Sequence, residues 1–212
     1  MKAVIFDMDG VIADTQKIHG EIEANLLRKQ GIEIEGHEIS ARFAGVRDFE
    51  MFETILKENG KTANVDELCS VKRKLFGEAI EKGVDSIEGA VELIHELHAK
   101  GVPLAVASSS NRKWIEQILT SLAVFDHFEV IVAGSEVPHG KPAPDIFLKC
   151  AELLKMTPEN CIVIEDGISG VFGAQKAEMK VIGFGKAVEN IADFSTHNMQ
   201  EVGKIVKGLL RF

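Results

Sequence analysis

The sequence has no apolar run that approaches the roughly 20 residues a helix needs to span a membrane. Cysteine is scarce, and the three thiols match no metal-binding spacing. Scattered single cysteines are typical of reduced, mostly buried thiols, so we expect a cytoplasmic protein. An apolar run starts directly after Met1 and Lys2, which leaves no room for a removable signal peptide. The cysteines are Cys69, Cys150 and Cys161.

An excess of positive charge is also lacking, since the formal net charge is −9. This acidic balance argues against nucleic acid or an anionic membrane as the main partner. It does not exclude a small anionic substrate, because the local field of a site can oppose the global charge. With 212 residues, 45% of them hydrophobic, the chain is long enough for one large domain or a domain with an insert. We expect a monomer.

Short apolar runs alternate with helical patterns along most of the chain. Unbroken apolar runs of this length are typical of strands buried on both faces of a parallel sheet. Alternating strands and helices form βαβ units with right-handed crossovers, so the sequence predicts an α/β fold with a doubly wound parallel sheet. The predicted strands are 4–6, 102–107, 129–133, 161–164 and 180–184, the predicted helices are 90–100, 112–122, 145–154 and 169–177, and a polar turn with a closing helix is expected at 193–212.

One block near the start of the chain breaks this alternation. It shows helical patterns at 15–30, 49–58 and 65–82, without a convincing buried strand. We therefore predict a helical insert, a cap domain at 15–84, within a core domain made of 1–14 and 85–212.

Polar side chains follow four of the predicted strands. In an open α/β sheet, ligands bind beyond the carboxyl ends of the strands, so these four segments are expected to meet. An Asp-x-Asp-Gly sequence alone is also a common polar turn, and only the partners on the other strands favour a site. The residues are Asp7 and Asp9, Ser108, Lys141, and the pair Glu165 and Asp166.

These residue types suit phosphoryl transfer. Asp7 can attack phosphorus and form an aspartyl-phosphate, which divides one difficult displacement into two steps. Carboxylates this close repel each other and a phosphate dianion, so a hard cation such as Mg²⁺ is expected between them. Lys141 and Ser108 can bind the phosphate oxygens, and Asp9 can act as the general acid and base.

The four motifs together resemble the haloacid dehalogenase superfamily, and more narrowly its β-phosphoglucomutase and phosphoglycolate phosphatase branch. The matching sequences are Phe-Asp-Met-Asp-Gly-Val, the hydroxyl after the second strand, Gly-Lys-Pro-Ala-Pro-Asp, and Ile-Glu-Asp-Gly-Ile-Ser-Gly, with a helical cap after the first motif. The resemblance covers essentially the whole chain. It implies Asp7 as nucleophile, Asp9 as acid/base, Ser108 and Lys141 as phosphate-binding residues, and Asp7 with Asp166 as Mg²⁺ ligands, with Glu165 in a position that supports the metal. From the residues themselves we add Ser109 as a phosphate-binding residue and Asp9, through its backbone carbonyl, as a further Mg²⁺ ligand.

Four further residues of the insert are candidates for substrate contact. In the mutase that this branch includes, a threonine and a histidine at the positions of Thr15 and His19 assist the acid/base aspartate. A histidine on the helix surface is an equally good interpretation of His19. Arg47 and Lys72 could reach a second anionic group, although a run of charges such as 72–74 is usually a solvated surface.

The sequence thus predicts a Mg²⁺-dependent phosphatase that acts on a small phosphorylated metabolite, a sugar phosphate in particular. A phosphomutase of the β-phosphoglucomutase kind shares every core residue and is the main alternative. A non-catalytic binding protein ranks below both, because the predicted nucleophile and metal ligands are all present. We also predict that Ser110 and Asn111 cap the helix that follows them.

Overall fold

The computed structural model describes residues 2–43 and 46–211 of the chain. Its centre is a parallel sheet in which the described strands lie in the order β3-β2-β1-β4-β5-β6. Strands are added first on one side of β1 and then on the other, so the order reverses beside β1. The predicted α/β fold with a doubly wound parallel sheet is confirmed. The strands are β1 (Ala3–Phe6), β2 (Leu104–Ser108), β3 (Val130–Ala133), β4 (Cys161–Glu165), β5 (Lys180–Phe184) and β6 (Phe194–Thr196).

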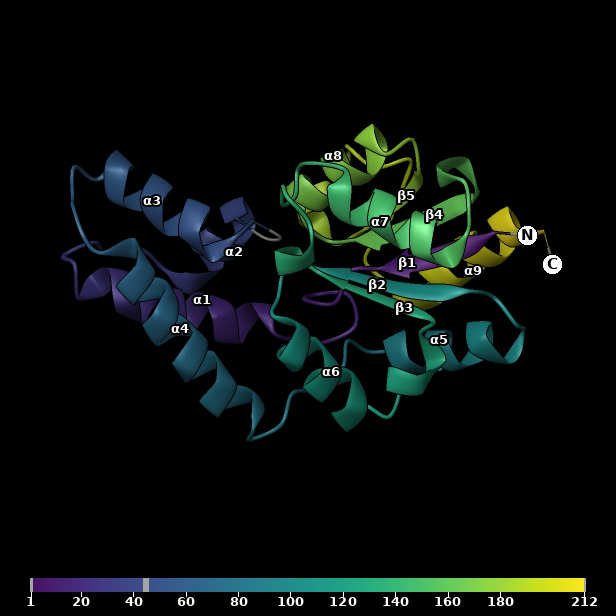
Figure 1. Cartoon of the computed structure of the whole chain (residues 1–212), viewed down its shortest axis with the longest axis horizontal. Coiled ribbons are helices and arrows are strands. Elements are labelled where there is room, and N and C mark those ends of the chain that lie inside the picture. Colours follow the sequence, from purple (N-terminus) through teal and green to yellow (C-terminus); the bar gives the residue numbers. More distant parts are fainter. Residues whose placement is uncertain (1, 44–45, 212) are drawn as a thin grey trace.

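Helices cover both faces of this sheet, and Figure 1 shows α7 and α8 on one side with α5 and α6 on the other. All four residues of β1 are buried, as its unbroken apolar sequence predicts. Val4 and Phe6 belong to the apolar cluster under α5, α6 and α9, while Ala3 and Ile5 belong to the one under α7 and α8. These helices are α5 (Ala90–Ala99), α6 (Arg112–Ser121), α7 (Asp145–Leu154), α8 (Ile168–Lys176) and α9 (Met199–Leu210).

In the described residues, four α-helices between β1 and α5 form a separate group, called the insert below. They enclose an apolar cluster of their own, with Leu27, Ile39, Phe52 and Ile55 almost fully buried. Figure 1 shows the insert beyond the end of the sheet that lies opposite the N-terminus, which is the end where the parallel strands finish. The helices are α1 (Gln16–Arg28), α2 (Gly36–Phe43), α3 (Asp48–Glu58) and α4 (Val65–Ile80).

The two connections between the core and the insert run side by side. Ala13 forms an antiparallel bridge with Ser86, and the amide of Asp14 donates to the carbonyl of Asp85 at 2.8 Å. The two connecting segments are thus hydrogen-bonded to each other where the chain enters and leaves the insert. The predicted division into 1–14, 15–84 and 85–212 stays a prediction, and its residues 1, 44, 45 and 212 lie outside the described part of the chain.

Among the α-helices and strands of the described residues, the sequence analysis missed α2 and β6. Helix α2 has only Ile39 fully inside, so its apolar pattern is too short to show a helical repeat. Strand β6 has three residues and begins at the exposed Phe194, and it lies in the segment that was expected to be a polar turn. Within the described residues, every helix is too short or too polar to cross a membrane.

Candidate active site

The loop after β1 brings two aspartates to the carboxyl edge of the sheet. Gly10 turns the chain away with a φ of +87°, a conformation that side chains disfavour. A Cβ atom at this position would lie 2.0 Å from Oδ2 of Asp166. The glycine therefore lets the acidic loop after β4 approach the loop after β1, so Asp7 and Asp166 lie close together.

Lys141 is the centre of the core side of the site. Only 1% of the residue is exposed, and its Nζ donates to Asp7 Oδ1 at 2.5 Å, to Glu165 Oε1 at 2.5 Å and to the Ala107 carbonyl at 3.0 Å. Burial alone would lower the pKa of Lys141, but attraction to Asp7 and Glu165 outweighs it and raises that pKa. Lys141 is therefore a permanent cation beside Asp7. Its predicted role in phosphate binding stays a prediction.

Three carboxylates gather around this lysine. Oxygen atoms of Asp7, Glu165 and Asp166 lie within 4.8 Å of one another. Burial, followed by repulsion from neighbouring carboxylates, raises the pKa of Asp166 well above its usual range, and burial does the same for Asp7 despite Lys141. With all three carboxylates ionised, the group holds two more negative charges than Lys141 offsets, and the raised pKa values reflect burial and this repulsion. A set of oxygen donors with this surplus fits a hard divalent cation such as Mg²⁺.

Glu165 is fixed in place by the start of α8. Its Oε2 accepts a hydrogen bond from the Gly167 amide at 2.9 Å. A Cβ atom on Gly170 would lie 1.7 Å from Oε1 of Glu165, so only a glycine leaves room for this carboxylate. The Gly-x-x-Gly spacing after Glu165 thus serves the acidic group directly.

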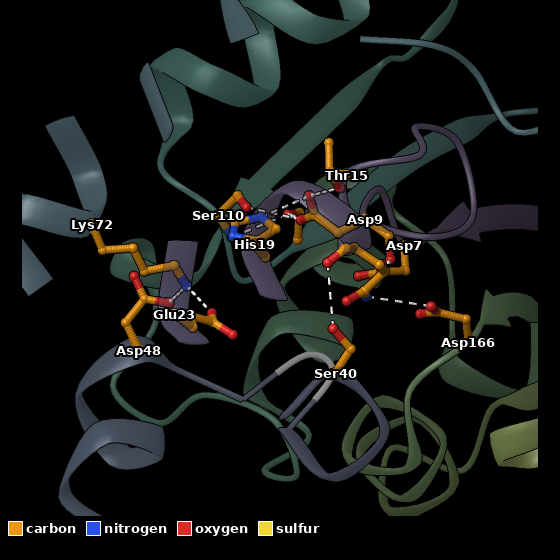
Figure 2. Close-up of polar contacts among 12 residues, drawn as sticks. Asp7, Asp9, Thr15, His19, Glu23, Ser40, Asp48, Lys72, Ser110 and Asp166 are labelled. Carbon is orange, nitrogen blue, oxygen red and sulfur yellow. Dashed lines mark hydrogen bonds and ion pairs between the residues drawn. The ribbon is translucent and has the colours of Figure 1, made fainter. Parts of the chain in front are cut away.

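The carboxylate of Asp9 lies among donors from the core and the insert, and Figure 2 shows Thr15, His19 and Ser110 around it. Oδ1 accepts from Thr15 Oγ1 at 2.5 Å and lies 3.4 Å from His19 Nε2. Oδ2 accepts from Ser108 Oγ at 3.1 Å and from Ser110 Oγ at 2.8 Å. Burial would raise the pKa of Asp9, but the contacts with His19, Thr15 and Ser110 together lower it. In the described residues, the Asp9 carboxylate is not part of the three-carboxylate group expected to hold the metal.

Ser108, the last residue of β2, and the two serines that follow it make different contacts, and the phosphate binding predicted for Ser108 and Ser109 stays a prediction. Ser108 is buried and donates to Asp9, while Ser109 lines the cavity of the site. The interpretation of Ser110 as a helix cap is wrong, because its hydroxyl donates to Asp9. Asn111 does cap α6, since its Oδ1 accepts from the Lys113 amide at 3.0 Å.

A cavity of about 290 Å³ separates the core from the insert. Asp7 and Asp9 line it from the core, and His19, Arg47 and Lys72 line it from the insert. Thr15 is fully buried beside Asp9 and is not among the lining residues. The structure therefore brings predicted residues from both parts to one cavity.

The two predicted cations of the insert already have partners. Lys72 Nζ donates to Glu23 Oε1 at 2.5 Å and also to Asp48 Oδ1. The Arg47 guanidinium crosses to the core and donates to the carbonyls of Gly134 at 2.8 Å and Val137 at 3.0 Å. Arg47 thereby ties the start of α3 to the loop after β3.

Sequence analysis missed Gln16, Glu23 and Asp48. Gln16 Nε2 donates to the Asp9 carbonyl at 3.1 Å and lies 3.4 Å from Asp166 Oδ2. Glu23 comes one helical turn after His19, a spacing that places both on one face of α1 and could have indicated it. Asp48 gave no such indication, because its link to Lys72 spans two helices.

Comparison with known proteins agrees with the geometry of this site. The family model for haloacid dehalogenase-like hydrolases matches residues 4–184. The chain is 32% identical to a fructose-1-phosphate phosphatase of Escherichia coli (strain K12), with 84% of this chain and 94% of the relative covered. It is 36% identical to a bifunctional riboflavin kinase/FMN phosphatase of Arabidopsis thaliana, with 98% of this chain and 53% of the relative covered. The chain thus spans about half of that second relative's length.

A solved structure leads to the same family. The crystal structure of a β-phosphoglucomutase from Clostridium difficile matches with a TM-score of 0.85 and 25% identity over 100% of both chains. The fold and the site define a hydrolase with an aspartate-based centre at the carboxyl edge of a parallel sheet. The chain belongs to the haloacid dehalogenase-like hydrolase family. The predicted resemblance and the predicted enzyme class, a phosphoric monoester hydrolase, are confirmed.

Proposed function

We propose that the protein is a Mg²⁺-dependent phosphatase that hydrolyses a small phosphorylated metabolite, a sugar phosphate in particular. The observation that carries this proposal is the position of Asp7, which lines the cavity while Lys141 donates to its Oδ1 at 2.5 Å. A nucleophilic carboxylate needs cations beside it when it approaches an anionic ester. The fructose-1-phosphate phosphatase of Escherichia coli supports a sugar phosphate as the substrate.

The proposed reaction has two steps. The negative charge of a bound phosphate opposes the lowered pKa of Asp9, so Asp9 carries a proton when the substrate is in place. Asp7 attacks phosphorus, the bond from phosphorus to the ester oxygen breaks, and Asp9 gives that oxygen its proton. A water molecule then attacks the aspartyl-phosphate, Asp9 takes its proton, and Asp7 is released with inorganic phosphate. Thr15, Ser108 and Ser110 hold the Asp9 carboxylate in one orientation for both transfers. Ser109 and Lys141 would bind the phosphate oxygens.

The acidic group at the carboxyl edge supports the predicted metal. Asp7, Glu165 and Asp166 would hold Mg²⁺, and the bound ion would offset repulsion between the Asp7 carboxylate and the substrate phosphate. Gly10 and Gly170 supply the space in which these carboxylates can meet. A cytoplasmic monomer stays our expectation for the protein as a whole.

A phosphomutase is the second candidate, because Thr15 and His19 both contact Asp9 and a β-phosphoglucomutase is a structural relative. A mutase must bind a bisphosphate, which favours free cations in the insert. Lys72 and Arg47 are instead bound to carboxylates and to core carbonyls. This occupation of the cations supports the phosphatase. A non-catalytic phosphometabolite-binding protein would need no nucleophile, and Asp7 is in place.

A phosphate-release screen over phosphorylated sugars tests the proposal. β-Glucose 1-phosphate is followed in parallel for conversion to glucose 6-phosphate. We expect free phosphate to appear at the rate at which a sugar monophosphate is lost. Rapid formation of glucose 6-phosphate with little phosphate released would show that the enzyme is a mutase.

A further inference from the structure

Three charged residues of the insert form a cluster that the proposed reaction does not use. They are Glu23 on α1, Asp48 at the start of α3 and Lys72 on α4, and we call them the insert triad. Lys72 is 3% exposed and donates to both carboxylates. All three line the same cavity as Asp7. Figure 2 shows the insert triad set apart from the group around Asp9, so it faces a different part of any bound substrate.

The charge of Lys72 is neutralised by its partners. Burial would lower the pKa of Lys72, yet attraction to Glu23 and Asp48 raises it, so the side chain stays an ammonium. Two of its three N–H donors bind carboxylates. Two carboxylates against one ammonium leave the insert triad with one surplus negative charge. The Asp48 side chain is 33% exposed, so the surplus is available at the cavity surface.

Two arginines also line this space, and neither changes that balance at the insert triad. The Arg47 guanidinium donates to carbonyls of the core loop at 2.8 and 3.0 Å, so its donors point away from the insert triad. Arg73 and Asp66 are both exposed on α4 and both line the cavity, so their opposite charges offset each other. A surface charge is strongly screened by water, whereas the buried Glu23 and Lys72 are screened far less.

We propose that the insert triad selects the leaving group of the substrate. Its carboxylate oxygens accept hydrogen bonds from hydroxyl groups, and its surplus negative charge repels a second phosphate or a carboxylate. The substrate class is therefore a monophosphate ester of a neutral, hydroxyl-rich compound, and bisphosphates are rejected. This inference rests on the proposed function and narrows its substrate.

The test compares hexose monophosphates with the bisphosphates of the same sugars, by kcat/KM for phosphate release. We expect the wild-type protein to prefer each monophosphate by about tenfold or more, since two like charges in an enclosed site repel strongly. Asp48→Asn keeps the shape but removes the surplus charge, and it should lower this preference by about tenfold, mostly through the KM of the bisphosphate. Glu23→Gln should act in the same direction.

Glu53→Gln is the matched control, because Glu53 is exposed on α3 and does not line the cavity. It removes the same charge from the same helix, and the preference should stay as in the wild type. Circular dichroism melting checks that the variants fold. Equal use of mono- and bisphosphates by the wild-type protein would overturn the proposal. An equal effect of Glu53→Gln would overturn it too, because the charge would then act from a distance.

A further substrate distinguishes failure of this inference from failure of the proposed phosphatase function. The simple ester 4-nitrophenyl phosphate carries no hydroxyl-rich group, so loss of phosphate release from this compound and from all sugars would contradict the phosphatase itself. Calorimetry then measures the binding of the same mono- and bisphosphate pairs to the protein. Tighter binding of the monophosphates would support the selection, and equal affinities would overturn it.

Discussion

The core and the insert each bury a lysine between two carboxylates. In the core, Lys141 joins Asp7 and Glu165, and in the insert Lys72 joins Glu23 and Asp48. The core arrangement has a third carboxylate, Asp166, with an oxygen within 4.8 Å of those of Asp7 and Glu165. In the described residues, the insert triad is not part of a group of three or more side chains that could hold a metal ion.

One additional carboxylate changes what each arrangement can bind. The core cluster consists of Asp7, Lys141, Glu165 and Asp166. With its carboxylates ionised it has two surplus negative charges, and its three carboxyl groups offer only oxygen ligands. That combination suits a divalent cation. The insert triad keeps one surplus charge, which a row of substrate hydroxyls can satisfy. An arrangement of a buried lysine between two carboxylates is therefore expected to bind a metal ion in the core cluster, and to favour an uncharged part of the substrate in the insert triad.

The largest effect is expected from the core cluster, where Asp7 is the proposed nucleophile. Asp7→Asn should reduce phosphate release by at least ~1000-fold, about 4 kcal/mol, because an amide cannot serve as the nucleophile. Asp14→Asn is the control, since Asp14 is exposed on the same loop. Steady-state phosphate release measures the loss, and circular dichroism confirms the fold. More than ~1% residual activity would overturn the assignment of Asp7.

The lysines provide the next comparison, through stability. Lys72→Met leaves Glu23 and Asp48 close together and without their cation, which should lower the free energy of unfolding by about 3 kcal/mol or more. Lys74→Met, an exposed lysine on the same helix, should change it by less than about 0.5 kcal/mol. Urea unfolding measures both values.

The effect of added Mg²⁺ on stability should distinguish the core lysine from the insert lysine. Lys141→Met should also destabilise the protein, but a divalent cation can replace the lost charge in the core cluster. We expect Mg²⁺ to recover part of the stability of Lys141→Met and none of that of Lys72→Met. An equal recovery in both variants would mean that the ion acts as general salt and would contradict a metal site confined to the core.

A smaller effect concerns the metal requirement itself. Activity should disappear in excess chelator and return with Mg²⁺. Asp166→Ala removes one of three oxygen ligands and should raise the Mg²⁺ concentration for half-maximal activity by roughly 10–100-fold. Asp126→Ala, an exposed position in the 3₁₀-helix Phe125–His127, serves as the control. Undiminished activity in excess chelator would rule out the metal.

Much of the core could be predicted because its determinants are local. Each buried strand is an unbroken apolar run, and the parallel topology then forces the residues after those runs to one edge. Asp7, Lys141 and Asp166 meet there although they are distant in the sequence. Glycines after the acidic residues add a local indication, since only glycine tolerates the close approach of a carboxylate at Gly10 and Gly170.

The insert was less predictable because its contacts depend on how helices pack. Lys72 lies 49 positions from Glu23 and 24 from Asp48, and no strand register relates them. A lysine within a charged run gives the same pattern whether it is solvated or buried. Ser110 shows the same limit on a smaller scale, because a hydroxyl before a helix can cap it or turn toward Asp9.

The last prediction concerns His19 on α1, whose ring lies beside the carboxylate of the acid/base aspartate. Its Nε2 lies 3.4 Å from Asp9, its ring stacks on Phe76 at 4.1 Å, and its Nδ1 is buried without a partner among the described residues. In a phosphatase, water is the acceptor and Asp9 retains Thr15 and two serines, so His19→Ala should reduce phosphate release by only a few-fold. In a mutase, the acceptor is a sugar hydroxyl that this part of the insert must align, and the loss should be ~10-fold or more, as for an acid/base assistant. His37→Ala, an exposed histidine on α2, is the control. Rates of phosphate release and of glucose 6-phosphate formation are measured on the same samples, and a tenfold loss confined to isomerisation would decide for the mutase.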